Sequence, residues 1–120
     1  MVNNRTCRPL YDLTLVQAFV AESNFEVVNR RAREHMKNLA WSSSELRALV
    51  SALRVDRHYK GSKQAQQSEV GELDVDVYLI KFDEDSLAEN RSGLEFYIKL
   101  AIDPEEPTVA IVSFHLSGSP

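Results

Sequence analysis

The sequence predicts an α+β protein in which N-terminal helices pack on a C-terminal antiparallel β-sheet. In the segment Leu94–Ile102, large apolar residues at every second position alternate with Glu95, Tyr97, Lys99 and Ala101, the pattern of a strand with one buried face. Thr108–His115, rich in β-branched and aromatic residues, follows across a short Pro-bearing connection, which indicates an antiparallel hairpin. The chain before residue 54 has helical spacing of its apolar residues instead. Helices followed by strands in this order are typical of the α+β class.

Three helices are predicted in the first half of the chain. Asp12 is a suitable N-cap for the first helix, whose apolar stripe contains Leu13, Val16 and Val20. The second helix is expected over Val28–Leu39, after a short edge strand at Phe25–Val27. The third begins after Ser42, which forms a capping box with Glu45 three residues later.

The rest of the chain predicts one more strand and several connections. Leu73–Phe82 alternates like the later strands and is expected to pair with them. Asp56–Glu72 is polar and without a period, and Asp83–Gly93 is an acidic connection, so neither predicts a regular element. With an extended arm at 1–11 and a flexible tail at 116–120, residues 1–120 are expected to form a single domain.

Composition and charge restrict the class of protein. No apolar run approaches the roughly 20 residues of a membrane span, so no membrane partner is expected. The single cysteine, Cys7, cannot form an internal disulfide, which fits a cytoplasmic protein. Residues 1–68 hold eleven Lys and Arg against six Asp and Glu, a balance of +5, whereas residues 69–120 hold three against twelve, a balance of −9. Any contact with nucleic acid is therefore expected in the first half.

The helix-covered face of the sheet should carry Phe96 and Ile98, which leaves Tyr97 and Lys99 on a face open to a ligand. His115 ends the neighbouring strand, and a basic stretch follows the third helix: Arg54, Arg57, His58, Tyr59, Lys60 and Lys63. Such residues can cleave RNA without metal or cofactor, which requires a base, an acid and a cation near the phosphate. Neither the histidine spacing nor the lone cysteine predicts a metal site. Basic residues after a helix are also favoured by the helix dipole alone, so spacing leaves a plain solvated surface open.

Several short motifs, in order along the chain, resemble the motility quorum-sensing regulator (MqsR) family of bacterial toxins. Arg5-Thr6, Tyr11-Asp12-Leu13 and Val16-Gln17 are similar to the family's opening, and Leu53 followed by Tyr59-Lys60 is similar to the segment after its third helix. The strand motifs of the family resemble three further stretches: Asp76-Val77-Tyr78, Tyr97-Ile98-Lys99 and Val112-Ser113-Phe114.

The resemblance implies a RelE-like fold and a metal-independent endoribonuclease that cuts mRNA and is silenced by an antitoxin, expected to be a helix-turn-helix protein encoded next door. Lys60 and Tyr97 match the family's active-site lysine and tyrosine. The sequence departs from the family at other site positions. Val75 stands where the resemblance leads one to expect glutamine, His115 where it leads one to expect lysine, and Gly61 and Ser62 replace the residues that follow Tyr-Lys in the family.

Two hypotheses follow from this comparison. In the first, the protein is a toxin ribonuclease in which Lys60 and Tyr97 act on the phosphate with help from Lys99 and His115. The remaining RNA contacts would then come from Arg54, Arg57, His58, Tyr59 and Lys63. In the second, it is a catalytically weakened relative that serves as a protein-binding or regulatory module on the same fold.

Overall fold

The structure is a computed structural model that describes residues 8–103 and 105–117. Arg5, Cys7 and most of the predicted arm lie outside the described residues, as do residues 118–120 of the predicted tail. The elements, in chain order, are α1 (Leu13–Ala21), β1 (Phe25–Val27), α2 (Arg30–Asn38), α3 (Ser43–Ala52), α4 (Val55–His58), β2 (Tyr59–Ser68), β3 (Gly71–Asp83), β4 (Ala88–Glu89), β5 (Leu94–Asp103) and β6 (Thr108–Leu116). None of the helices in this part of the chain is long and apolar enough to cross a membrane.

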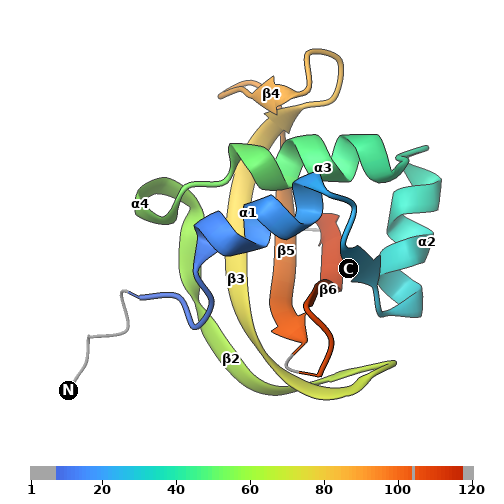
Figure 1. Cartoon of the computed structure of the whole chain (residues 1–120). Coiled ribbons are helices and arrows are strands. Elements are labelled where there is room, and N and C mark those ends of the chain that lie inside the picture. The colour runs from blue at the N-terminus through green and yellow to red at the C-terminus, as the bar shows by residue number, and fades with distance from the viewer. Residues whose placement is uncertain (1–7, 104, 118–120) are drawn as a thin grey trace.

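The strands form one sheet in the order β1-β6-β5-β3-β2, with β4 paired to the end of β3 (Figure 1). The α+β class is confirmed, and the three strands predicted near the C-terminus pair in the antiparallel direction as expected, but the whole sheet is mixed because the edge strand β1 joins it in the parallel direction. β1 runs parallel to β6, because α2 and α3 separate it from the later strands and no hairpin constrains its direction. The remaining pairs are antiparallel, including the predicted β5–β6 hairpin.

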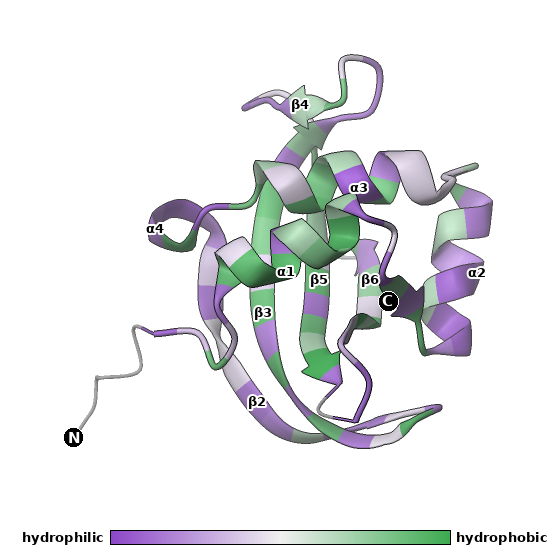
Figure 2. Cartoon of the chain, viewed as in Figure 1, coloured by the Kyte–Doolittle hydropathy of each residue, from purple (hydrophilic) through white to green (hydrophobic). Residues whose placement is uncertain are grey.

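Helix α2 stands beside β1 and β6 at that edge of the sheet, and α1 and α3 lie across the side of the sheet that we call the front face (Figure 1). Phe96 and Ile98 are fully buried there, as predicted. Trp41 sits between α2 and α3, its ring centroid 4.9 Å from that of Phe96 and 5.1 Å from that of Phe114. The alternation of hydrophobic and hydrophilic residues along β3 and β5 in Figure 2 shows why the helices pack on one face.

The helix starts follow local hydrogen bonding. The side chain of Asp12 accepts a hydrogen bond from the Thr14 N–H, and the Ser42–Glu45 capping box is complete. The second helix begins at Arg30 rather than at Val28, because Asn29 caps it by accepting hydrogen bonds from two backbone N–H groups.

The polar segment after α3 was predicted to lack regular structure, and this prediction is wrong. It forms α4 and then β2, an edge strand held by backbone pairing to β3. A strand at a sheet edge exposes much of its surface, so β2 lacks the apolar alternation that identifies the inner strands. The acidic connection also contains a short strand, β4.

Two bulges bend β2 around the opposite side of the sheet, which we call the back face. The hairpin tip thereby reaches the other edge, where the Glu69 N–H donates to the Val28 carbonyl. Arg33 of α2 fixes this contact through hydrogen bonds of 2.7 and 2.6 Å to the Glu69 carboxylate, which lower the pKa of Glu69.

The hairpin encloses a second, smaller apolar cluster on the back face: Val28, Val75, Val77, Ala101, Ala110 and Val112. The face that carries Tyr97 and Lys99 was predicted to be open to a ligand. Only the part toward Tyr97 remains open, because the curled hairpin covers the rest.

The end of the N-terminal arm is pinned to β3 by a buried carboxylate. Asp76 has no solvent exposure, and its two oxygens accept hydrogen bonds of 2.9 Å from the backbone N–H groups of Leu10 and Tyr11. One oxygen also accepts a hydrogen bond from the Ser62 hydroxyl of β2 at 2.6 Å. Asp76 therefore joins three segments of the chain.

We expect Asp76→Asn to lower the free energy of unfolding by about 2–3 kcal/mol, because an amide N–H₂ would face N–H donors and leave buried groups unpaired. Urea unfolding followed by the fluorescence of Trp41 measures this loss. Asp85→Asn, at an exposed turn position, is the matched control that removes the same charge. Equal stability of the two variants would show that the three hydrogen bonds do not hold the arm.

Candidate functional site

Three of the predicted site residues meet on the open part of the back face. Tyr97 and His115 are directly opposite each other on β5 and β6. Their rings are stacked, with centroids 4.8 Å apart and planes at 21°. The Lys99 Nζ lies 5.8 Å from the centroid of the Tyr97 ring. The alternation of β5 and its pairing with β6 thus place a phenol, an ammonium and an imidazole in one cluster.

Lys99 is half-buried, and its ammonium donates a hydrogen bond of 2.8 Å to the Gln66 side-chain oxygen. Burial lowers the pKa of Lys99, and the positive charge of Lys63 lowers it further. Gln66 and Lys63 reach this position because the bulged β2 curls over the back face. The site therefore holds a partly desolvated cation beside the Tyr97–His115 stack.

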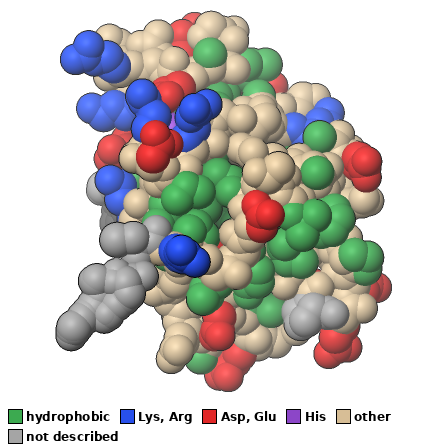
Figure 3. All heavy atoms as spheres, turned by 60° about the vertical axis from the view of Figure 1, so that its left-hand side comes forward, with side chains coloured by type: hydrophobic (Ala, Val, Ile, Leu, Met, Phe, Trp, Pro, Cys, Tyr) green, Lys and Arg blue, Asp and Glu red, His purple; other side chains and the backbone are tan. Residues whose placement is uncertain are grey.

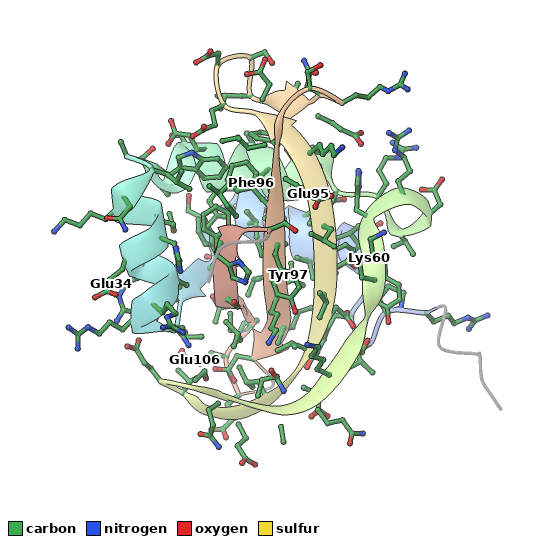
Figure 4. All side chains as sticks on the ribbon, turned by 180° about the vertical axis from the view of Figure 1, so that it is seen from behind. Glu34, Lys60, Glu95, Phe96, Tyr97 and Glu106 are labelled. Carbon is green, nitrogen blue, oxygen red and sulfur yellow. The ribbon has the colours of Figure 1, made fainter. Side chains whose placement is uncertain are left out.

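Lys60 lies one strand farther away. Tyr59 pairs with Tyr78 and Gly61 with Val77, so Lys60 is the extra residue of a bulge in β2. Strand β3 separates it from β5 (Figure 4). Two strand spacings place the backbones at Lys60 and Tyr97 about 10 Å apart. Their long side chains can approach the same RNA segment from two sides, but the structure records no contact between them.

Lys60 also borders a groove of about 620 Å³ at the end of the back face nearest β4. The groove is rich in cationic side chains, with two carboxylates among them: Arg57, Lys60, Lys81, Arg91, Glu89 and Glu95. Lysine and arginine side chains gather at the upper left of the molecule in Figure 3. Arg57 is ion-paired with Glu89 at 2.8 Å, which reduces its availability to a phosphate.

His58 occupies the wall of this groove but is only 4% exposed. Its Nδ1 accepts a hydrogen bond from the Arg54 N–H, so Nε2 carries the proton and donates to Glu89 at 2.8 Å. Both nitrogens are occupied within the protein. His58 thus fixes α4 against the β4 hairpin and has no free nitrogen for an RNA contact.

Tyr59 and Arg54 lie away from the Tyr97 cluster. Tyr59 points to the front face, where its ring lies 5.6 Å from that of Tyr78 and its hydroxyl hydrogen-bonds to Ser62. Arg54 lines an open groove of about 870 Å³ between α1, α4 and the start of β2. Lys60 borders this groove as well, so it links the two surfaces.

A second cavity, of about 260 Å³, lies between α2, the end of β6 and the tip of β2. His35 of α2 faces His115 across it, with ring centroids 5.8 Å apart. Lys99 and Arg31 also line it. This cavity continues the Tyr97 cluster toward the helix side of the molecule.

Sequence reasoning missed His35, Arg31, Gln66 and the carboxylate of Glu95 as neighbours of the site. A signal existed for His35, which lies three residues after the buried Ala32 and hence beside the inward stripe of α2. Gln66 carried no such signal, because its place depends on the bulges of β2.

The fold and this site define a small α+β protein with a cationic, imidazole-bearing back face, a surface chemically suited to phosphate groups. Its family model is that of the motility quorum-sensing regulator, toxin of MqsA, which matches residues 8–116. The chain belongs to this family and is a toxin of a toxin–antitoxin system. Neither curated proteins nor solved structures give a match.

We expect Lys63→Gln to raise the pKa of Lys99 toward its ordinary value, because the substitution removes a neighbouring positive charge. The rise should be partial, since burial of Lys99 remains. A side-chain NMR titration of the Lys99 Cε resonance measures the pKa. Lys37→Gln, on an exposed part of α2, should leave it unchanged. An unaltered titration of Lys99 in the Lys63 variant would contradict this electrostatic coupling.

Proposed function

We propose that this toxin is a metal-independent endoribonuclease that cleaves mRNA on the back face of its sheet. The observation that carries the proposal is the Tyr97–His115 stack with the Lys99 ammonium beside it. Cleavage through the 2′-hydroxyl needs proton transfer and stabilisation of the charge that develops on the phosphate. The cluster supplies an imidazole for the first task and a cation for the second.

His115 is oriented for proton transfer by its own backbone surroundings. Its Nδ1 lies 2.8 Å from the Leu116 carbonyl oxygen, which can only accept a hydrogen bond. Nδ1 therefore carries the proton, and in the neutral ring Nε2 is free to accept another. Stacking on Tyr97 fixes the plane of the imidazole. In the proposed reaction Tyr97 positions the phosphate and Lys99 stabilises its charge.

Lys60 supports a path for RNA across the sheet. It stands about 10 Å from Tyr97, on the far side of β3, and borders the cationic groove with Lys81 and Arg91. A phosphate held by Lys60 would place a neighbouring phosphate of the same strand near Tyr97. Lys63 extends the positive charge along β2.

The family description supports an antitoxin of the MqsA type as the protein partner. We propose that it is a helix-turn-helix protein encoded next to the toxin, and that both proteins act in the cytoplasm. Neighbouring gene order and co-purification from a co-expression strain test this part of the proposal.

A second candidate function is a catalytically weakened relative that acts through protein binding. Val75 favours it, because this position, where the family resemblance leads one to expect glutamine, is fully buried in the small apolar cluster of the back face. The polar side chain that the resemblance leads one to expect is therefore absent at this position.

If the first proposal is right, Lys60→Ala and Tyr97→Phe should each lower RNA cleavage by about 10²–10³-fold, because each removes a preorganised group at the phosphate. Growth arrest on induction should be relieved in parallel. Cleavage of a synthetic RNA by the purified toxin, in the presence of EDTA, provides the direct measurement. The exposed Lys37→Ala is the control for loss of one positive charge.

Stability distinguishes loss of chemistry from loss of fold. Lys60 is exposed and Tyr97 half-buried outside the front-face core, so both variants should unfold close to the wild-type urea concentration. A wild-type toxin that binds its antitoxin but neither cleaves RNA nor arrests growth would leave the binding module as the function.

A further inference from the structure

The cavity between α2 and the end of β6 contains a second imidazole beside the proposed site. His35 from α2 and His115 from β6 both line it, with ring centroids 5.8 Å apart and ring planes at 48°. Among the described residues that line the cavity, the charged side chains are those of Arg31 and Lys99, both positive. A cavity of about 260 Å³ is smaller than the roughly 300–1,000 Å³ typical of small-molecule pockets. It suits a phosphodiester group more than a whole nucleotide.

We propose that His35 is a second catalytic residue, the general acid that complements His115 as general base. The inference rests on the proposed ribonuclease function and deepens it. A base and an acid must flank the same phosphate for concerted proton transfer. The two imidazoles are the pair of proton-transfer groups that the cavity brings together, and the cavity has room for a phosphodiester group.

The assignment of the two roles follows from hydrogen bonding. Nδ1 of His115 donates a hydrogen bond to the Leu116 carbonyl oxygen, so the proton of the neutral ring is on Nδ1. Nε2 can then accept a proton, which is the role of the base. Within the part of the chain that the structure describes, no hydrogen bond occupies either nitrogen of His35. As an imidazolium, His35 has N–H groups free to donate to a leaving oxygen.

The position of His35 is fixed by the elements around it. Asn29 caps α2, the helix that carries His35, and Ala32 is the residue of this helix that is buried in the core. The Arg33–Glu69 ion pair connects the same helix to the β2–β3 hairpin. The groups that face the two imidazoles come from every element at the cavity. They are Arg31 from α2, Gln66 and Gln67 from β2, Tyr97 and Lys99 from β5, and Ser113 from β6.

The proposed step transfers one proton at each end of the phosphate. Nε2 of His115 takes the proton of the ribose 2′-hydroxyl, and the 2′-oxygen forms a bond to phosphorus. The bond from phosphorus to the 5′-oxygen breaks, and this oxygen takes a proton from the His35 imidazolium. The products are a 2′,3′-cyclic phosphate and a free 5′-hydroxyl. Lys99 and Arg31 stabilise the negative charge on the non-bridging oxygens.

The role of His35 can be tested with two forms of one short RNA, an ordinary substrate and one with sulfur in place of the bridging 5′-oxygen. Sulfur leaves as a thiolate, a far weaker base than an alkoxide, and needs no general acid. His35→Gln should slow cleavage of the ordinary RNA by about 10²–10⁴-fold and cleave the sulfur RNA at close to the wild-type rate. His115→Gln should be slow on both substrates, because the base is still required.

Lys37→Gln, on the same helix and exposed, should match wild type on both RNAs. His35→Asn provides a second variant, and urea unfolding followed through Trp41 confirms that each variant is folded. Cleavage of the ordinary RNA by folded His35→Gln within about threefold of the Lys37 control would overturn the proposal and leave the ribonuclease function standing. A loss that sulfur does not recover would also overturn it. No cleavage of either RNA by wild type would instead remove the ribonuclease function, and the role of His35 with it.

Discussion

The buried carboxylate of Asp76 is the constraint on which the arrangement of the other segments depends. It accepts hydrogen bonds from the arm through Leu10 and Tyr11 and from β2 through Ser62. A buried carboxylate without such partners would be strongly destabilising, so these segments must stay together for the protein to fold. Burial, and then the negative charge of Asp76, raise the pKa of the adjacent Tyr78. The Tyr78 hydroxyl is the buried side-chain group in the described residues that lacks a hydrogen-bond partner. In this part of the interior the hydrogen-bond donors are directed to the Asp76 carboxylate, while the neighbouring Tyr78 hydroxyl is left without a partner.

The sequence predicts those strands in which one face is buried, because their apolar residues then recur at every second position. β5 lies in the middle of the sheet with helices on its front face, so its apolar residues alternate and its position can be inferred. β2 pairs on one side only and exposes much of its surface, so its sequence carries no such period. The parallel direction of β1 also lies beyond local patterns, because β1 is far from β6 in the chain and no hairpin joins the two strands.

The same distinction explains the candidate site. Tyr97, Lys99 and His115 could be grouped in advance, because two adjacent strands with known alternation place them on one face. Lys60 could be selected by resemblance, but its separation from Tyr97 by an intervening strand required the sheet order. Gln66 and His35 join the site only because two bulges bend β2 and because Arg33 fastens the hairpin to α2. Contacts that depend on the bending of β2 cannot be inferred from the residue pattern of a short segment.

The departures from the family pattern are consistent with a changed distribution of chemical roles. An ammonium group at position 115 would mainly donate protons and stabilise charge near neutral pH, whereas an imidazole can accept a proton or donate one. Under the proposed function, histidine at 115 would supply a base where lysine would supply a cation, and the cation would come from Lys99 on the adjacent strand. Val75 fits the same account, because its side chain helps to form the apolar floor under the curled hairpin. A polar side chain at position 75 would need a hydrogen-bond partner inside this covered cluster. The proposed reaction therefore draws its proton-transfer groups from the cavity beside α2, which His35 and His115 line with ring centroids 5.8 Å apart.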